Sequence, residues 1–153
     1  MKLSTKGRYG LKAMFDLALN FGDGPISLAC IAERQNISLN YLEQLISPLR
    51  KSELVKSVRG AQGGYMLAKE PSMINVGEIL TVLEGSLAPV DCLMDQDDDH
   101  ACEASDVCCS RTVYELIYEK INEVVYSITL NDMIEDFKAK GNTDFSNIKC
   151  GCK

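Results

Sequence analysis

The chain has 153 residues, of which 46% are hydrophobic and 25% charged, and its formal net charge is −6. This length and composition suit one domain with a buried core, and they argue against both two large independent domains and a disordered chain. No apolar run approaches the about 18 residues of a membrane span, and none follows the basic residues near Met1, so we expect a cytoplasmic protein.

Apolar stripes with helical spacing predict three helices in the first fifty residues. The first runs from about residue 7 to 21 and is broken by the Gly-Asp-Gly-Pro segment 22–25. Ser27 is placed to cap a short second helix, and Ser38 to cap a third helix after a tight turn at 35–37. Pro48 should bend or end this third helix. A short helix, a turn and a longer helix with a polar face form a helix-turn-helix pattern.

Two short strands are predicted next, at 54–58 and 65–68, joined by a glycine-rich turn. A hairpin after a helix-turn-helix indicates the wing of a winged helix. A glycine-rich turn can also cradle phosphate, but such loops lead from a strand into a helix, and the strand predicted here argues against nucleotide binding. Asn75 and Glu78 have the spacing of a capping box and predict a further helix that stops at Gly85.

The second half contains an irregular segment and a long helix. Residues 88–110 show no periodicity and hold four of the seven cysteines. A long helix is predicted from Arg111, followed by a shorter one capped by Thr129 or Asn131. The long apolar stripe has no further domain to cover it, which predicts a partner subunit. We expect a mainly α fold with a small β-hairpin wing, divided into a DNA-binding domain at 1–87, a cysteine loop at 88–110, dimerisation helices at 111–140 and a flexible tail at 141–153.

Charge is distributed unevenly along the chain. Residues 1–72 hold ten Lys or Arg and six Asp or Glu, whereas the remainder holds six and sixteen. Local charge attracts phosphates within a Debye length, so only the front half can form a nucleic-acid surface. The first turn of a recognition helix points into the major groove, and an arginine on a glycine-rich wing tip can enter the minor groove. The candidate DNA-binding residues are Ser38, Asn40, Tyr41, Glu43, Gln44, Arg50, Arg59 and Gly60.

The cysteines of the irregular segment indicate metal or redox chemistry. In a chain without a secretion signal we expect free thiols rather than a disulfide framework. Nine residues separate Cys92 from Cys102 and five separate Cys102 from Cys108, which is not the paired spacing of a zinc ribbon. Thiolates brought together among the many carboxylates of this segment would repel one another without a cation.

The first eighty residues contain the motifs LSTKGRY at 3–9, ISLNYLEQL at 37–45, LRK at 49–51, VRG at 58–60, GGY at 63–65 and VGEI at 76–79. Together these motifs resemble those of the IscR-type winged-helix regulators of the Rrf2 family. The resemblance extends from Met1 to about Phe137. It implies a dimeric, DNA-binding transcription factor, in many members controlled by an iron–sulfur cluster.

The same resemblance implies cluster ligands. Three cysteines of this loop bind a [2Fe-2S] cluster in such regulators, and Cys92, Cys102 and Cys108 match them in order. The family's fourth ligand is a histidine three residues after the third cysteine, but Arg111 stands there, and a guanidinium cannot bind iron. The alternatives are His100, Cys109, a nearby carboxylate or a residue of the other subunit. Cluster type depends on this ligand.

Three functions can be weighed against these features. The first is a regulator controlled by an iron–sulfur cluster, acting on cluster-assembly genes. The second is a cluster-free regulator of the same fold, of a cysteine-metabolism type, controlled by a partner enzyme, a small ligand or thiol oxidation. The third, a thiol oxidoreductase or metal hydrolase, is disfavoured because the chain has a single histidine and no C-x-x-C motif. We therefore expect a regulator and not an enzyme.

Overall fold

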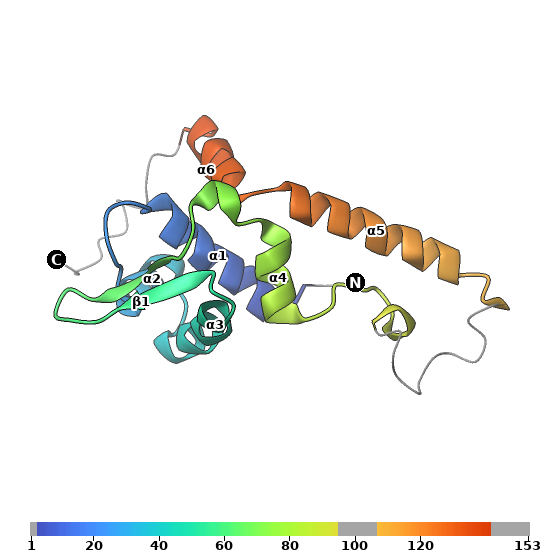
Figure 1. The fold of residues 1–153 in the computed structure, drawn as a ribbon, viewed down its shortest axis with the longest axis horizontal. Helices are drawn as coiled ribbons and strands as arrows, with labels where there is room; N and C mark the ends of the chain where they lie inside the picture. The colour runs from blue at the N-terminus through green and yellow to red at the C-terminus, as the bar shows by residue number, and fades with distance from the viewer. Residues whose placement is uncertain (1–2, 95–106, 142–153) are drawn as a thin grey trace.

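The computed structural model describes residues 3–94 and 107–141. The middle of the cysteine loop, with His100 and Cys102, and nearly all of the expected flexible tail lie outside the described residues. Figure 1 shows the elements. In chain order they are α1 (Thr5–Leu19), α2 (Leu28–Gln35), α3 (Leu39–Lys51), β1 (Val55–Val58), β2 (Gly64–Leu67), the short 3-10 helix η1 (Pro71–Met73), α4 (Val76–Glu84), the short 3-10 helix η2 (Asp91–Leu93), α5 (Arg111–Ser127) and α6 (Leu130–Ala139).

α2 and α3 begin directly after the predicted capping residues, Ser27 and Ser38. The Ser27 hydroxyl accepts from the Cys30 amide at 3.2 Å, and the Ser38 hydroxyl accepts from the Tyr41 amide at 3.3 Å. The predicted capping box is confirmed at α4, and Thr129 rather than Asn131 caps α6. α1 begins earlier than expected because Ser4 caps it.

Pro48 does not end α3. The helix continues for three residues to Lys51, and the amide of Ser52 donates to the Pro48 carbonyl at 3.0 Å. The ring lies in the last turns of the helix, so the missing Pro48 amide costs only the one hydrogen bond to the Gln44 carbonyl. Of the two outcomes predicted for Pro48, the end of the helix was therefore wrong, and the bend stays a prediction.

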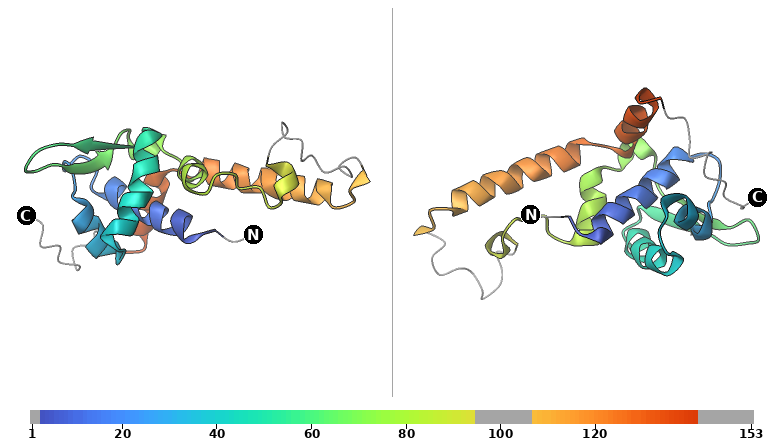
Figure 2. Two further views of the ribbon diagram at one scale, coloured as in Figure 1. Left: turned by 90° about the horizontal axis from the view of Figure 1, so that it is seen from below. Right: turned by 180° about the vertical axis from the view of Figure 1, so that it is seen from behind.

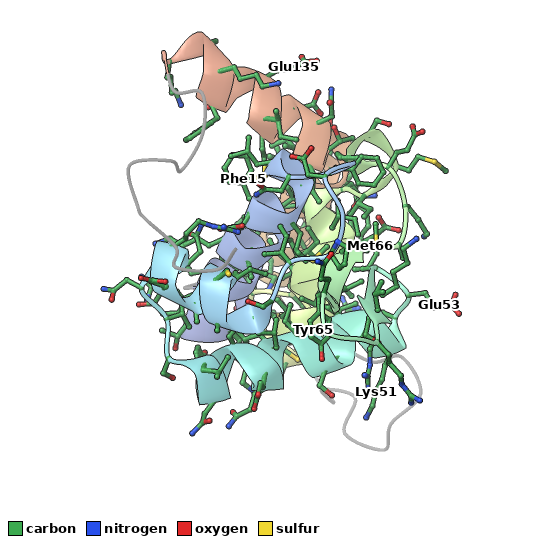
Figure 3. All side chains as sticks on the ribbon, turned by 90° about the vertical axis from the view of Figure 1, so that its left-hand side faces the viewer. Phe15, Lys51, Glu53, Tyr65, Met66 and Glu135 are labelled. Atoms are coloured by element: carbon green, nitrogen blue, oxygen red, sulfur yellow. The ribbon has the colours of Figure 1, made fainter. Side chains whose placement is uncertain are left out.

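The core is built around α1, which contacts α2, α3, α4 and α6. Ala13 and Met14 are fully buried on this helix, and the Phe15 ring meets the Phe137 ring of α6 edge-on with centroids 5.3 Å apart. Figure 3 shows Phe15 among the side chains between α1 and α6. α1 is therefore the element against which the helix-turn-helix is positioned.

Two glycines allow α1 and α4 to pack at close range. A Cβ at Gly7 would lie 2.4 Å from the Glu84 carboxylate, and one at Gly10 would lie 2.0 Å from the Leu83 side chain. One oxygen of Glu84 accepts from the Ser4 amide at 2.9 Å, from the Ser4 hydroxyl at 2.8 Å and from the Gly7 amide at 3.0 Å. The C-terminal end of α4 thus satisfies amide donors at the N-terminus of α1.

A buried carboxylate fixes α2 against α1. Asp16 has no exposed surface. Arg34 donates from Nε to one oxygen of Asp16 at 3.1 Å and from Nη2 to the other, and Gln35 Nε2 donates at 2.9 Å. Because both donors lie on α2, the ion pair sets the place of the first helix of the helix-turn-helix.

The wing is a two-stranded antiparallel hairpin in which Val55 pairs with Leu67 and Val58 with Gly64. Its second strand also pairs with the segment before α2, because Ile26 and Tyr65 exchange amide–carbonyl hydrogen bonds at 2.7 and 2.8 Å. The strands follow the predicted ones within a residue. The hairpin is therefore attached, through Tyr65, to the segment that leads into the helix-turn-helix.

α5 projects from the rest of the described structure, on the side opposite the wing (Figures 1 and 2). None of its residues is buried. Near its C-terminal end the Tyr126 ring packs over Gly77, and the Tyr126 and Thr81 hydroxyls are 3.1 Å apart. The contact with α4 therefore holds one end of α5 and leaves much of its apolar side exposed.

We predict that Glu84→Ala lowers the free energy of unfolding by about 1–3 kcal/mol, because it leaves the donors of Ser4 and Gly7 without their acceptor. Urea unfolding followed by circular dichroism measures it. Glu123→Ala is the control, since its ion pair with Lys120 is exposed to solvent and contributes little to stability. Equal losses in the two variants would contradict the role of the Glu84 contact.

Candidate DNA interface and cysteine segment

α3 has one buried side and one exposed side. Its buried side is formed by Leu42, Leu45, Ile46 and Leu49, which are at most 2% exposed. Asn40, Glu43 and Gln44 are exposed, as expected. The core therefore anchors α3 along one face, and the polar side chains of the opposite face are free to meet a macromolecule.

Ser38 and Tyr41 take part in the structure of α3 itself. The Ser38 hydroxyl oxygen caps the helix, which leaves its O–H as a donor. Tyr41 is half-buried, and its ring meets the Tyr9 ring of α1 edge-on, with centroids 6.1 Å apart. Tyr41, although predicted to contact DNA, therefore also packs on α1 through its ring.

The exposed side of α3 is hollowed along its length, and the hollow extends beyond the predicted residues. Ser47 and Lys51 continue it toward the C-terminal end of the helix, and Figure 3 shows Lys51 at the surface there. Their spacing of three and four residues from Gln44 and Ser47 was the sequence signal that could have identified them. The hollow is lined by Asn40, Glu43, Gln44, Ser47, Pro48 and Lys51.

The wing tip places Arg59 and Gly60 at the surface. Gly60 has a φ of +124°, and its carbonyl accepts from the Gly63 amide at 3.0 Å. A Cβ at Gly63 would lie 2.3 Å from the Val58 carbonyl oxygen, so the turn is tight on that side. This compact, glycine-rich tip leaves the Arg59 side chain without bulky neighbours.

Cations of this surface are available to an external anion. Arg50, Lys51 and Arg59 are exposed, and none forms an ion pair with a carboxylate within residues 3–94 and 107–141. In the second half of the chain, by contrast, Lys120 is paired with Glu123 and Lys140 with Asp136. The front surface can therefore attract phosphates without first breaking internal pairs.

The described part of the cysteine segment brings Cys92 next to α5. Cys92 is exposed on η2 and, with Arg111, Glu115 and Glu119, lines a small hollow of about 230 Å³. Arg111 Nε donates to Glu115 Oε1 at 2.7 Å. Two of the alternatives for a fourth ligand, a nearby carboxylate and Cys109, thus lie within the described residues.

The structure lowers the pKa of the Cys108 thiol. Its sulfur lies 3.4 Å from the Ser110 hydroxyl. This hydrogen bond lowers the pKa of the Cys108 thiol, with smaller contributions from the Ser110 and Arg111 amides and the Arg111 charge. A thiolate is the form that binds metal, so Cys108 is disposed toward ligation.

The described cysteines do not form an assembled metal site. Cys92, Cys108 and Cys109 are free thiols, and within the described ranges no group of three or more potential ligands is gathered. Cys30 is buried in α2 and disulfide-bonded, which departs from the expectation of free thiols throughout. The free thiols of the segment are groups of the kind that bind iron. Cys102, the remaining predicted ligand, lies outside the described residues.

The family model for Rrf2, described as an iron-dependent transcriptional regulator, matches residues 3–136. The chain belongs to the Rrf2 family. A solved structure of T. potens IscR is 54% identical, with a TM-score of 0.72, covering 89% of this chain and 88% of that one. The solved structure of CymR, described as the global cysteine regulator of B. subtilis, is 47% identical with a TM-score of 0.71, covering 87% and 95%. The transcriptional regulator IscR of Yersinia enterocolitica is 43% identical over 136 residues, or 89% of this chain and 80% of the relative.

These likenesses confirm the winged-helix fold and the IscR-type resemblance. The protein is an Rrf2-family DNA-binding transcriptional regulator and not an enzyme. Its relatives include both IscR and CymR regulators, so the family alone leaves the controlling signal open. None of the described helices is long and apolar enough to cross a bilayer.

We predict that Arg59→Ala weakens binding to specific sites by about 1–3 kcal/mol, because the wing tip loses the side chain that can enter the minor groove. Fluorescence anisotropy on a preferred and a scrambled duplex measures it. Lys138→Ala, an exposed cation on α6, is the control. A loss of equal size on both duplexes would show that Arg59 contacts phosphate only.

Proposed function

We propose that the protein is a homodimeric transcriptional regulator whose promoter binding is controlled by an iron–sulfur cluster, [2Fe-2S] in type, at genes of cluster assembly. The observation that carries the proposal is the position of the cysteine segment. It follows α4, which packs on the DNA-binding half, and precedes α5, whose apolar side is exposed. A change in this segment can therefore affect both DNA reading and dimer geometry.

Double-stranded DNA is bound by the exposed side of α3 and by the wing. Ser38, Asn40, Glu43 and Gln44 stand on the first turns of α3, where a recognition helix meets base edges and phosphates. Glu43 accepts from cytosine amino groups, and Asn40 and Gln44 suit adenine. Arg50 adds charge toward the end of the helix, while Arg59 and Gly60 approach the minor groove.

A second copy of the chain covers α5. Val113, Leu116, Ile117 and Val124 are between 41% and 57% exposed along this helix. An apolar groove of about 830 Å³ continues the surface between α5 and the segment after α4, and Leu3 contributes to it. Contiguous apolar surface of this kind marks an interface, and a two-fold axis allows the same stripe to serve both subunits.

We predict that Leu116→Asp converts the dimer to a monomer and lowers affinity for palindromic DNA, because it places a charge in the apolar interface. Light scattering after size-exclusion chromatography measures the mass. Thr112→Asp adds the same charge at an exposed polar position of α5 and should remain dimeric. A Leu116→Asp dimer of wild-type affinity would contradict the assignment.

Cys92, Cys102 and Cys108 hold the cluster, with a fourth ligand drawn from the alternatives given above. The donor chemistry fits, because Cys92 is accessible and the hydrogen bond from Ser110 lowers the pKa of the Cys108 thiol. When bound, the cluster supplies positive charge and a redox couple to a segment rich in carboxylates. The role of the chain is to link that segment to α4 at Gly85 and to α5 at Arg111.

A cluster-free regulator of the cysteine-metabolism type is the second candidate. The similarity to CymR and the ion pair of Arg111 with Glu115, at the position of the family's histidine ligand, favour it. In this case the DNA interface and the dimer are the same. Only the signal differs, and it comes from a partner enzyme, a small ligand or thiol oxidation.

We predict that anaerobically purified protein contains iron and sulfide in equal amounts, with visible absorption bands, and that its promoter affinity changes when the cluster is removed. Cys92→Ser should lose the iron, whereas Thr112→Ser, a substitution at an exposed polar residue of α5, should keep it. Elemental analysis and promoter titrations measure these outcomes. Iron-free wild-type protein would favour the second candidate, and equal affinities of the two forms for every promoter would reject cluster control.

A further inference from the structure

Leu39 is an exposed leucine at the start of the recognition helix. It is 42% exposed, whereas the other leucines of α3 are at most 2% exposed. It occupies the first helical position, directly after the Ser38 cap. Packing in the core therefore does not explain why a large apolar side chain stands at this position.

The surroundings of Leu39 are polar. Ser38 and Asn40 precede and follow it, and Glu43 lies one turn further along, all three exposed. A leucine isolated among polar side chains is not part of the apolar groove along α5, which is lined by other residues. The position suits a contact with a small apolar group within an otherwise polar partner.

The major groove contains one such group. Thymine carries a 5-methyl group at its major-groove edge, and the other three bases present only hydrogen-bonding groups and C–H edges there. Asn40, Glu43 and Gln44 can hydrogen-bond to bases, but an amide or carboxylate gains nothing from a methyl group. An aliphatic side chain on the first turn can cover the methyl group and exclude water from it.

We infer that Leu39 determines specificity by packing on a thymine methyl group in each half-site. The inference rests on the proposed placement of α3 in the major groove. Covering one methyl group is expected to change the dissociation constant about fourfold per half-site. The effect depends on the methyl group alone, which separates it from a general contribution of Leu39 to affinity.

The test is a methyl-deletion scan. A preferred duplex is first selected from a random pool with the wild-type protein, and each thymine is then replaced singly by deoxyuracil, which lacks only the methyl group. Wild type and Met73→Ala, which alters an exposed apolar residue of η1 distant from α3 in sequence, should lose about fourfold affinity at one position per half-site. Leu39→Ala removes the contact from both subunits of the dimer, so it should bind the thymine duplex about sixteenfold more weakly, fourfold per half-site, and show no further loss at either position.

Each other result overturns the inference. If Leu39→Ala retains the wild-type response to deoxyuracil, Leu39 does not read a methyl group. The same conclusion follows if the wild type responds at no position. Equal weakening of Leu39→Ala on selected and scrambled duplexes shows a general role. If the selection enriches no sequence, the proposed DNA interface fails as well, so the two failures are distinguishable.

Discussion

The placement of α1 determines where the DNA-binding elements stand. Its buried carboxylate, Asp16, accepts from Arg34 and Gln35 and thereby fixes α2. A buried carboxylate without its partners would be costly, so the pair admits one arrangement of the two helices. α3 then packs on the same core, and the wing is attached through Ile26 and Tyr65. A rigid frame of this kind lets a few side chains face DNA together.

The opposite end of α1 is held by a different interaction. Glu84 accepts from Ser4 and Gly7, and it immediately precedes the residue at which the chain turns toward Cys92. The N-terminus of α1, the end of α4 and the groove beside α5 thus meet in one region. A conformational change in the cysteine segment begins next to the helix that positions α2 and α3. This proximity gives the proposed control a physical route through packed elements.

Much of this architecture could be predicted because its signals are local. The caps at Ser27 and Ser38 and the capping box of Asn75 each depend on a residue three positions away. The contact of Glu84 with Ser4 joins residues 80 positions apart, and no periodicity in the sequence predicts it. Tyr41 was predicted to contact DNA, and its ring also meets the Tyr9 ring of α1, a contact that a stripe pattern does not reveal. Cluster ligation stays a prediction, since Cys102 lies outside the described residues.

The central claim is that α3 and the wing together contact DNA. Amide hydrogen exchange measured with and without a selected duplex tests it most directly, because the first amides of α3 have no intrahelical partner and report contact with phosphate. Slower exchange in α3 and in residues 59–64 is the predicted result. Protection confined to α5 and α6, with exchange in α3 unchanged, would contradict the account.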